Sequence, residues 1–227
     1  MISEKLQALH RRINDAAART GRDPKEVRLL AVSKTVGPEA VLEAARAGHR
    51  AFGENKVQEA VEKIEALRTH GLEWHFIGHL QKNKVKYIPG RFALVHSIDS
   101  LDLAERLART CREQGVVTPV LIQVNVSGED SKFGIPPGDL EPLLDRARAL
   151  DGIDPVGLMT LPPFDPDPEK ARPHFARLRE LRDRLGGQPG LSLPHLSMGM
   201  SHDFEVAVEE GATWIRVGTL LFGPRPD

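Results

Sequence analysis

Cysteine is almost absent from this sequence, because Cys111 is the only one in 227 residues. A single thiol excludes a disulfide framework and a cysteine-rich metal site within the chain. Cys111 falls in a helical pattern, where we expect it to be inert. Tyrosine is equally scarce, since Tyr87 is the only one. A reaction that needs a tyrosine base therefore has a single candidate in this chain.

An excess of either charge is also missing, because 31 basic residues balance 32 acidic ones and leave a net charge of −1. No net field attracts the chain to nucleic acid or to an acidic membrane. Residues 1–5 contain no apolar signal core, and no apolar run approaches membrane-spanning length. Hydrophobic residues make up 40% of the chain, which is enough for a core. We expect a soluble cytoplasmic protein with no nucleic-acid or membrane partner.

Strands and helices alternate along the chain at short spacing. Apolar residues at helical intervals predict a first helix over 2–19, which the turn residues at 20–24 end. The expected strands lie at 27–33, 49–53, 73–77, 92–98, 119–126, 153–159, 193–198 and 213–218. The expected helices between them lie at 37–48, 55–68, 80–87, 100–113, 138–149, 168–185 and 203–210.

That alternation predicts parallel strands joined by helical crossovers. Eight strands close a (β/α)₈ TIM barrel, whose usual length is about 250 residues. The competing fold is an open doubly wound sheet, which would carry a nucleotide fingerprint after its first strand. Residues 33–37 contain no such fingerprint. We expect one domain over 1–227, with an extra N-terminal helix at 1–20 and the barrel at 27–219.

Lys34 follows a continuous apolar run, Leu29–Val32, at the end of the first expected strand. In a TIM barrel the functional residues lie at the carboxyl ends of the strands. A lysine in the barrel mouth is partly desolvated, which frees its amine as a nucleophile. The alternative is that Lys34 leaves the sheet and forms a surface ion pair.

Two neighbouring strand ends have the composition of phosphate-binding loops. Residues 197–201 lead into a helix expected near 203, whose N–H groups would face an anion, and Ser201 adds a hydroxyl. After the last strand, Gly218 lets a phosphate approach the backbone and Thr219 donates. The alternative is that the glycines only shape turns. An amine opposite a phosphate site indicates a Schiff base with a phosphorylated aldehyde, of which pyridoxal 5′-phosphate (PLP) is the commonest cofactor.

Five motifs in the chain are distinctive, and they lie at Leu30–Thr35, Phe52–Asn55, Trp74–Gln81, Leu196–Ser201 and Arg216–Thr219. In this order they resemble the pyridoxal-phosphate homeostasis protein family, over nearly the whole chain. That family is similar to the N-terminal barrel domain of alanine racemase. The resemblance implies a barrel that holds PLP as a Schiff base on Lys34. It also implies that the protein buffers and delivers PLP, with no established catalytic turnover.

The resemblance implies cofactor-binding residues, no catalytic residue and no metal site. By similarity to alanine racemase, the Arg216 guanidinium faces the pyridine nitrogen. Arginine cannot give that nitrogen a proton, so the ring is a weaker electron sink than one partnered by aspartate. His75 and His79 are four residues apart, but Gly78 breaks the helix that a metal pair would need. The cofactor-binding residues that we expect are Lys34, Asn55, Ser201, Arg216, Gly218 and Thr219.

Several alternatives stay open at this point. Arg216 would instead form an ion pair inside the barrel, and Asn55 would cap a helix. Lys132 would be either a second amine for passing on PLP or a solvated loop lysine. The family usually has tyrosine where this chain has Lys56, so a role for position 56 is in doubt.

The alternative function is a PLP-dependent amino-acid racemase or lyase. Racemisation wants a second base opposite the lysine, which in alanine racemase is a tyrosine from a further domain of the partner subunit. The chain ends at Asp227, directly after the last expected strand, so we expect that domain to be missing. A third class is an interaction protein with a vestigial pocket. We favour a non-enzymatic carrier, a monomer rather than a dimer, with apo-PLP enzymes as transient partners.

Overall fold

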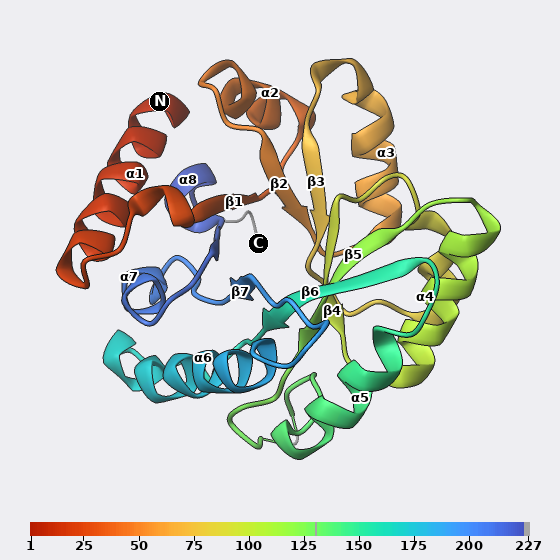
Figure 1. The fold of residues 1–227 in the computed structure, drawn as a ribbon. Helices are drawn as coiled ribbons and strands as arrows, with labels where there is room; N and C mark the ends of the chain where they lie inside the picture. The colour runs from red at the N-terminus through yellow and green to blue at the C-terminus, as the bar shows by residue number, and fades with distance from the viewer. Residues whose placement is uncertain (130, 225–227) are drawn as a thin grey trace.

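The computed structural model describes residues 1–129 and 131–224. Residues 130 and 225–227, which belong to the expected domain of 1–227, lie outside the described residues. Eight parallel strands form a closed barrel in chain order, with β1 paired to β8, so the predicted fold class is confirmed (Figure 1). The strands are β1 Arg28–Val32, β2 Ala51–Glu54, β3 Glu73–Phe76, β4 Leu94–Ile98, β5 Thr118–Gln123, β6 Ile153–Met159, β7 His195–Ser197 and β8 Trp214–Val217.

Helices surround the barrel on the outside. The α-helices are α1 Ile2–Arg19, α2 Pro38–Arg46, α3 Val57–Ala66, α4 Leu101–Glu113, α5 Leu140–Ala147, α6 Arg172–Gly186, α7 Phe204–Glu209 and α8 Thr219–Phe222. The short 3₁₀ turns are η1 Pro24–Glu26, η2 Arg68–His70, η3 Lys82–Tyr87, η4 Pro137–Asp139 and η5 Pro168–Ala171. Across residues 1–129 and 131–224, no helix is both long enough and apolar enough to cross a membrane.

The extra helix α1 completes the outer ring. It lies between α7 and α2 in Figure 1, beside α8, which has only four residues and is too short to cover β8 and β1. Its apolar stripe, which includes Leu6, Leu9 and Ile13, is buried. Ion pairs from Arg12 to Glu205 and from Arg19 to Glu209 attach it to α7.

Three of the differences from the predicted elements have a bearing on the fold. Of the segment at 80–87, only Lys82–Tyr87 is helical, and it forms the 3₁₀ turn η3 rather than an α-helix. Strand β7 begins only at His195, because Pro194 has no N–H to give a neighbouring strand. Strand β5 ends at Gln123 because the Asn125 N–H bonds instead to Ile135 of the returning loop.

The barrel interior holds a polar set of side chains among apolar ones. Leu30, Leu121 and Met159 belong to an apolar cluster together with Trp214. The buried polar residues of the strands include His75, His96, Ser197 and Arg216. The predicted helical position of Cys111 is confirmed, and its thiol is buried in α4.

Candidate functional site

A cavity of about 410 Å³ opens at the carboxyl ends of the strands. It is lined by all six residues that the sequence predicts for cofactor binding, namely Lys34, Asn55, Ser201, Arg216, Gly218 and Thr219. These residues come from both ends of the chain, and the pairing of β8 with β1 closes the barrel between them. Closure therefore brings the predicted amine and the predicted phosphate loops into one cavity.

Lys34 is half-buried in the turn that follows β1, and hydrogen bonds hold both of its neighbours. Lys63 Nζ donates to the Ser33 carbonyl at 2.7 Å, and the Thr35 N–H donates to Glu59 Oε1 at 2.7 Å. Thr35 has a φ of 63°, in the left-handed region that non-glycine residues rarely adopt. The turn that carries Lys34 is thus held in a strained conformation by α3.

A buried ion pair lies directly behind this turn. Lys63 Nζ is 2.6 Å from Glu54 Oε1, and the two side chains are 5% and 0% exposed. Glu54 Oε1 also accepts from the Ser33 hydroxyl at 2.7 Å. Burial raises the pKa of Glu54, and the hydrogen bonds from Lys63 and Ser33 oppose that rise. Residues of β2 and α3 are in this way attached to the end of β1.

Arg216 is buried, and two hydrogen bonds hold its guanidinium. Nη1 donates to Ser197 Oγ at 2.6 Å and Nη2 donates to the Thr160 carbonyl at 2.9 Å. Neither partner is charged, so the ion pair that the sequence left open is not what holds this side chain. Burial lowers the pKa of Arg216 to about 10, which leaves it protonated at neutral pH. In that state it can only donate hydrogen bonds.

The loop at 197–201 offers less backbone to an anion than the sequence predicts. The Met200 N–H donates to the Asp203 carboxylate at 2.6 Å, so this amide is satisfied inside the loop. The Ser201 hydroxyl still lines the cavity. Across it, Thr219 begins α8, and the first N–H of a helix has no acceptor within that helix. At Gly218 a Cβ would lie 3.3 Å from the Val32 carbonyl oxygen, so a larger residue would crowd β1.

Asn55 presents an acceptor to the same cavity. The first residue before α3 is Lys56, so Asn55 does not cap that helix. Its Oδ1 is buried and has no hydrogen-bond partner among the residues that the structure describes. A Cβ at Gly78 would lie 2.1 Å from the Asn55 carbonyl oxygen, so only glycine allows the segment after β3 to approach Asn55 this closely.

Sequence reasoning missed part of the cavity mouth. His79 lines the cavity, and its ring stacks on that of Phe133 at a centroid distance of 4.3 Å. Phe133 lines the cavity too and is 59% exposed. It belongs to the long loop after β5, where no periodic pattern indicates which side chain turns inward. The one available signal was an aromatic residue beside Lys132 in a polar loop.

The remaining candidate residues lie outside the cavity. Neither Lys56 nor Lys132 is part of its lining. His75 is buried in β3 while His79 lies in the cavity mouth, so the two histidines do not form a pair. Within residues 1–129 and 131–224, no group of three or more histidine, cysteine, aspartate or glutamate side chains could hold a metal ion.

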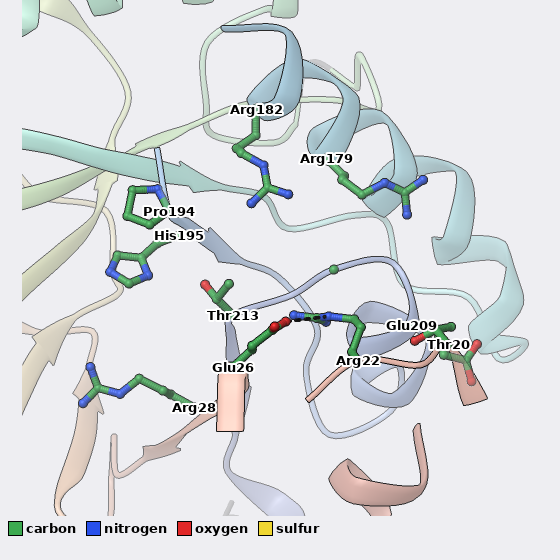
Figure 2. Close-up of a pocket in the computed structure, with 11 residues that line it drawn as sticks. Thr20, Arg22, Glu26, Arg28, Arg179, Arg182, Pro194, His195, Glu209 and Thr213 are labelled. Atoms are coloured by element: carbon green, nitrogen blue, oxygen red, sulfur yellow. Dashed lines mark hydrogen bonds and ion pairs between the residues drawn. The ribbon is translucent and has the colours of Figure 1, made fainter. Parts of the chain in front are cut away.

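A second cavity, of about 550 Å³, lies at the amino-terminal end of the barrel (Figure 2). Its lining includes Arg28, which begins β1, and His195, which begins β7. The arginines around it are paired with carboxylates, as Arg28 is with Glu73 and Arg179 with Glu210. This cavity is larger than the first, but it contains none of the predicted residues and lies at the end of the barrel opposite to where barrel sites occur.

The fold and the site together define a class of protein. Its members are closed barrels of parallel strands, in which a lysine after the first strand and the loops after the seventh and eighth strands line one cavity. Residues 5–226 match the family model described as "Alanine racemase, N-terminal domain". An alanine racemase of Clostridium difficile 630 has the same fold, with a TM-score of 0.73 at 15% identity, and this chain covers 58% of it.

More similar relatives narrow the class. The pyridoxal phosphate homeostasis protein of Aquifex aeolicus is 50% identical over 222 residues, which are 98% of this chain and 97% of that protein. The protein of that name in Escherichia coli K12 is 42% identical over 230 residues, or 99% and 97% of the two chains. PipY of Synechococcus elongatus PCC7942, solved with PLP bound, has a TM-score of 0.86 at 40% identity and covers 98% of this chain and 100% of its own. The chain belongs to the family of pyridoxal phosphate homeostasis proteins.

Proposed function

We propose that this protein binds PLP as a Schiff base on Lys34 and serves as a carrier and buffer of PLP in the cytoplasm, without catalytic turnover. The observation that carries the proposal is the composition of the carboxyl-end cavity. Two cations, Lys34 and Arg216, line it together with the hydroxyls of Ser201 and Thr219. Within the described part of the chain, no aspartate or glutamate is among its lining residues. That charge distribution favours a phosphorylated aldehyde.

The cavity also fits the cofactor by size and by its unpaired acceptor. Its volume of about 410 Å³ lies within the range of roughly 300–1,000 Å³ that is usual for small-ligand sites. The Asn55 Oδ1 has no partner among the residues described, and burying such an atom is costly unless a ligand satisfies it. The relatives named for PLP homeostasis, and PipY with PLP bound, support the same cofactor here.

Each residue has a task that follows from its place. PLP supplies an aldehyde for the lysine amine and a ring that accepts electrons. Lys34 provides the amine, and Ser201, Gly218 and Thr219 contact the phosphate. Arg216 donates toward the pyridine ring and cannot protonate it, which disfavours amino-acid chemistry that needs a strong electron sink. Such a site is suited to holding PLP rather than to catalysing amino-acid reactions with it.

The decisive experiment removes the amine. We expect purified protein reloaded with PLP to show the visible absorbance of a Schiff base, and Lys34→Ala to lose it. Lys132→Ala is the matched control, because Lys132 is a lysine outside the cavity lining. An unchanged band in Lys34→Ala, or its loss in Lys132→Ala alone, contradicts the assignment of Lys34.

The carrier role has its own test. Loaded protein is mixed with an apo-PLP enzyme, and recovery of that enzyme's activity is compared with the rate of PLP release into buffer. We expect transfer to the apo-enzyme to be faster than release. Sustained turnover of an amino acid that disappears in Lys34→Ala would instead identify a PLP-dependent racemase or lyase. Size-exclusion chromatography with light scattering checks the monomer that we propose.

A further inference from the structure

A row of hydrogen bonds crosses the barrel interior from the cavity to the opposite end. It begins where Arg216 Nη1 donates to Ser197 Oγ. Ser197 Oγ lies 2.8 Å from His96 Nδ1, and His96 Nε2 lies 2.9 Å from His75 Nδ1. His75 Nε2 then lies 2.7 Å from Glu73 Oε1, at the first residue of β3. The row connects β8, β7, β4 and β3, and all of its side chains except that of Glu73 are buried.

The arginine end determines the direction of the first bond only. A guanidinium only donates, so the Ser197 oxygen must accept from Arg216. That oxygen has a second lone pair, so the arginine by itself leaves the direction of the bond between Ser197 and His96 open. A neutral imidazole has one N–H, so each of the two histidines donates from one ring nitrogen and accepts at the other.

The carboxylate end determines the direction of the other bonds. Ionised Glu73 only accepts, and the hydrogen bond from His75 is the largest cause that lowers the pKa of Glu73. Neutral His75 therefore carries its proton on Nε2 and accepts from His96 at Nδ1. Neutral His96 donates from Nε2, so its Nδ1 accepts from the Ser197 hydroxyl. Arg28 Nη2, at 2.9 Å, holds the Glu73 carboxylate from the amino-terminal cavity shown in Figure 2.

We propose that His96 is a positioning residue for Arg216, acting through the Ser197 hydroxyl. With its acceptor at His96, the hydroxyl turns its oxygen toward the guanidinium. Without that acceptor, the hydroxyl proton is free to turn toward Arg216. Two hydrogen-bond donors, the hydroxyl and the guanidinium, would then face each other. The row cannot reverse while Glu73 is ionised, because a carboxylate only accepts, so the row fixes an orientation and does not conduct protons. For its effect on PLP, the inference rests on the proposed function.

A packing role for His96 is the competing explanation, because its ring also lies 6.3 Å from that of Trp214. Nuclear magnetic resonance of PLP-free wild-type protein separates the two without any variant. Long-range ¹H–¹⁵N correlations report which ring nitrogen of each histidine carries the proton. We expect His75 and His96 to be neutral, each with an unprotonated Nδ1, at neutral pH. A proton on Nδ1 of His96 overturns the inference, whether or not the protein binds PLP.

Variants test the effect on the cavity. We expect His96→Leu and Ser197→Ala each to weaken PLP binding about tenfold, as the loss of one hydrogen bond to a charged group does. The double variant should be no weaker than either single variant, because both remove the same interaction. His96→Asn, whose amide oxygen can accept from Ser197, should recover most of the affinity.

The possible outcomes separate this inference from the proposed function. Additive losses in the double variant, or a His96→Asn variant as weak as His96→Leu, overturn the inference and leave Lys34 unaffected. Wild-type protein with no Schiff-base absorbance contradicts the proposed function, and the histidine spectra still decide the direction of the row. Should a variant fail to fold, those wild-type spectra decide as well.

Discussion

At the residue scale, the two cations of the cavity are placed by different means. Arg216 extends from within β8 and is held by Ser197, at the end of β7, and by the Thr160 carbonyl, directly after β6. Lys34 lies just beyond the end of β1, in a turn whose backbone is held from α3. A side chain within a strand inherits its direction from the sheet, whereas a side chain in a turn depends on what holds the turn.

The hydroxyls at the phosphate side give a prediction at the same scale. We expect Ser201→Ala combined with Thr219→Ala to release PLP about ten to a hundred times faster, because each lost hydrogen bond to a charged group contributes about 1 kcal/mol or more. The Schiff base should still form, because Lys34 is intact. Stopped-flow absorbance during transfer to an excess of apo-enzyme measures the release. Unchanged release would remove both residues from the phosphate site.

At the scale of elements, α3 is the support of the Lys34 turn. Its Lys63 pairs with Glu54 of β2 and also donates to the Ser33 carbonyl of the β1 end. The end of β1, β2 and α3 thus meet at one buried ammonium group. A buried charge that loses its partner is far costlier than a pair that is replaced as a whole.

Removing one side of this pair should therefore be severe. We expect Lys63→Met to lower the free energy of unfolding by about 3–5 kcal/mol, since Glu54 is left buried and unpaired. Lys63→Met with Glu54→Leu should recover most of that loss. Urea unfolding measures both, and PLP binding in the double variant reports whether the turn still holds Lys34 in place.

The double variant decides what the pair contributes. If it is stable but forms the Schiff base more slowly than wild type, the pair positions Lys34. If the single and double variants are equally unstable, the destabilisation does not come from an unpaired Glu54, and the account given for this pair is wrong.

At the scale of the whole molecule, the histidine row makes stability depend on pH. Burial is the main cause that lowers the pKa of His75 and holds the pKa of His96 well below its usual value. The unfolded chain, with histidine pKa values near 6.5, therefore binds more protons than the folded one below that pH. The stability contributed by the two neutral histidines is fully present above about pH 6.5. It is lost as the pH falls toward the pKa values that these histidines have in the folded state.

The expected slope is about 1.4 kcal/mol per pH unit for each of the two histidines, on the acid side of about pH 6. Urea unfolding at intervals from pH 7.5 to 5 measures it, and His96→Leu should remove roughly one histidine's share. The exposed His70 provides the control, since His70→Gln should leave the slope unchanged. A slope that is the same in all three proteins would show that His96 does not contribute to acid stability.

Much of the fold could be predicted because its signals are local. The apolar run before Lys34 and the stripe of α1 are each read from residues close together in the chain, and the structure has these elements where they were expected. The α-helix predicted at 80–87 was wrong, because Val85 is the one buried side chain of that turn, and a single apolar contact does not define a helical face. The four-residue α8 was missed because one turn is too short to show a period.

The sequence by itself determined the order of strands and helices, the lysine at a strand end and the motifs that place the chain in its family. Only the tertiary structure decided which distant side chains meet: Phe133 over His79, Lys63 behind Lys34, and His96 between Ser197 and His75. The physical reason is that periodicity reports which face of an element is buried. Hydrogen bonds between elements depend on barrel closure and strand register, which no local pattern records.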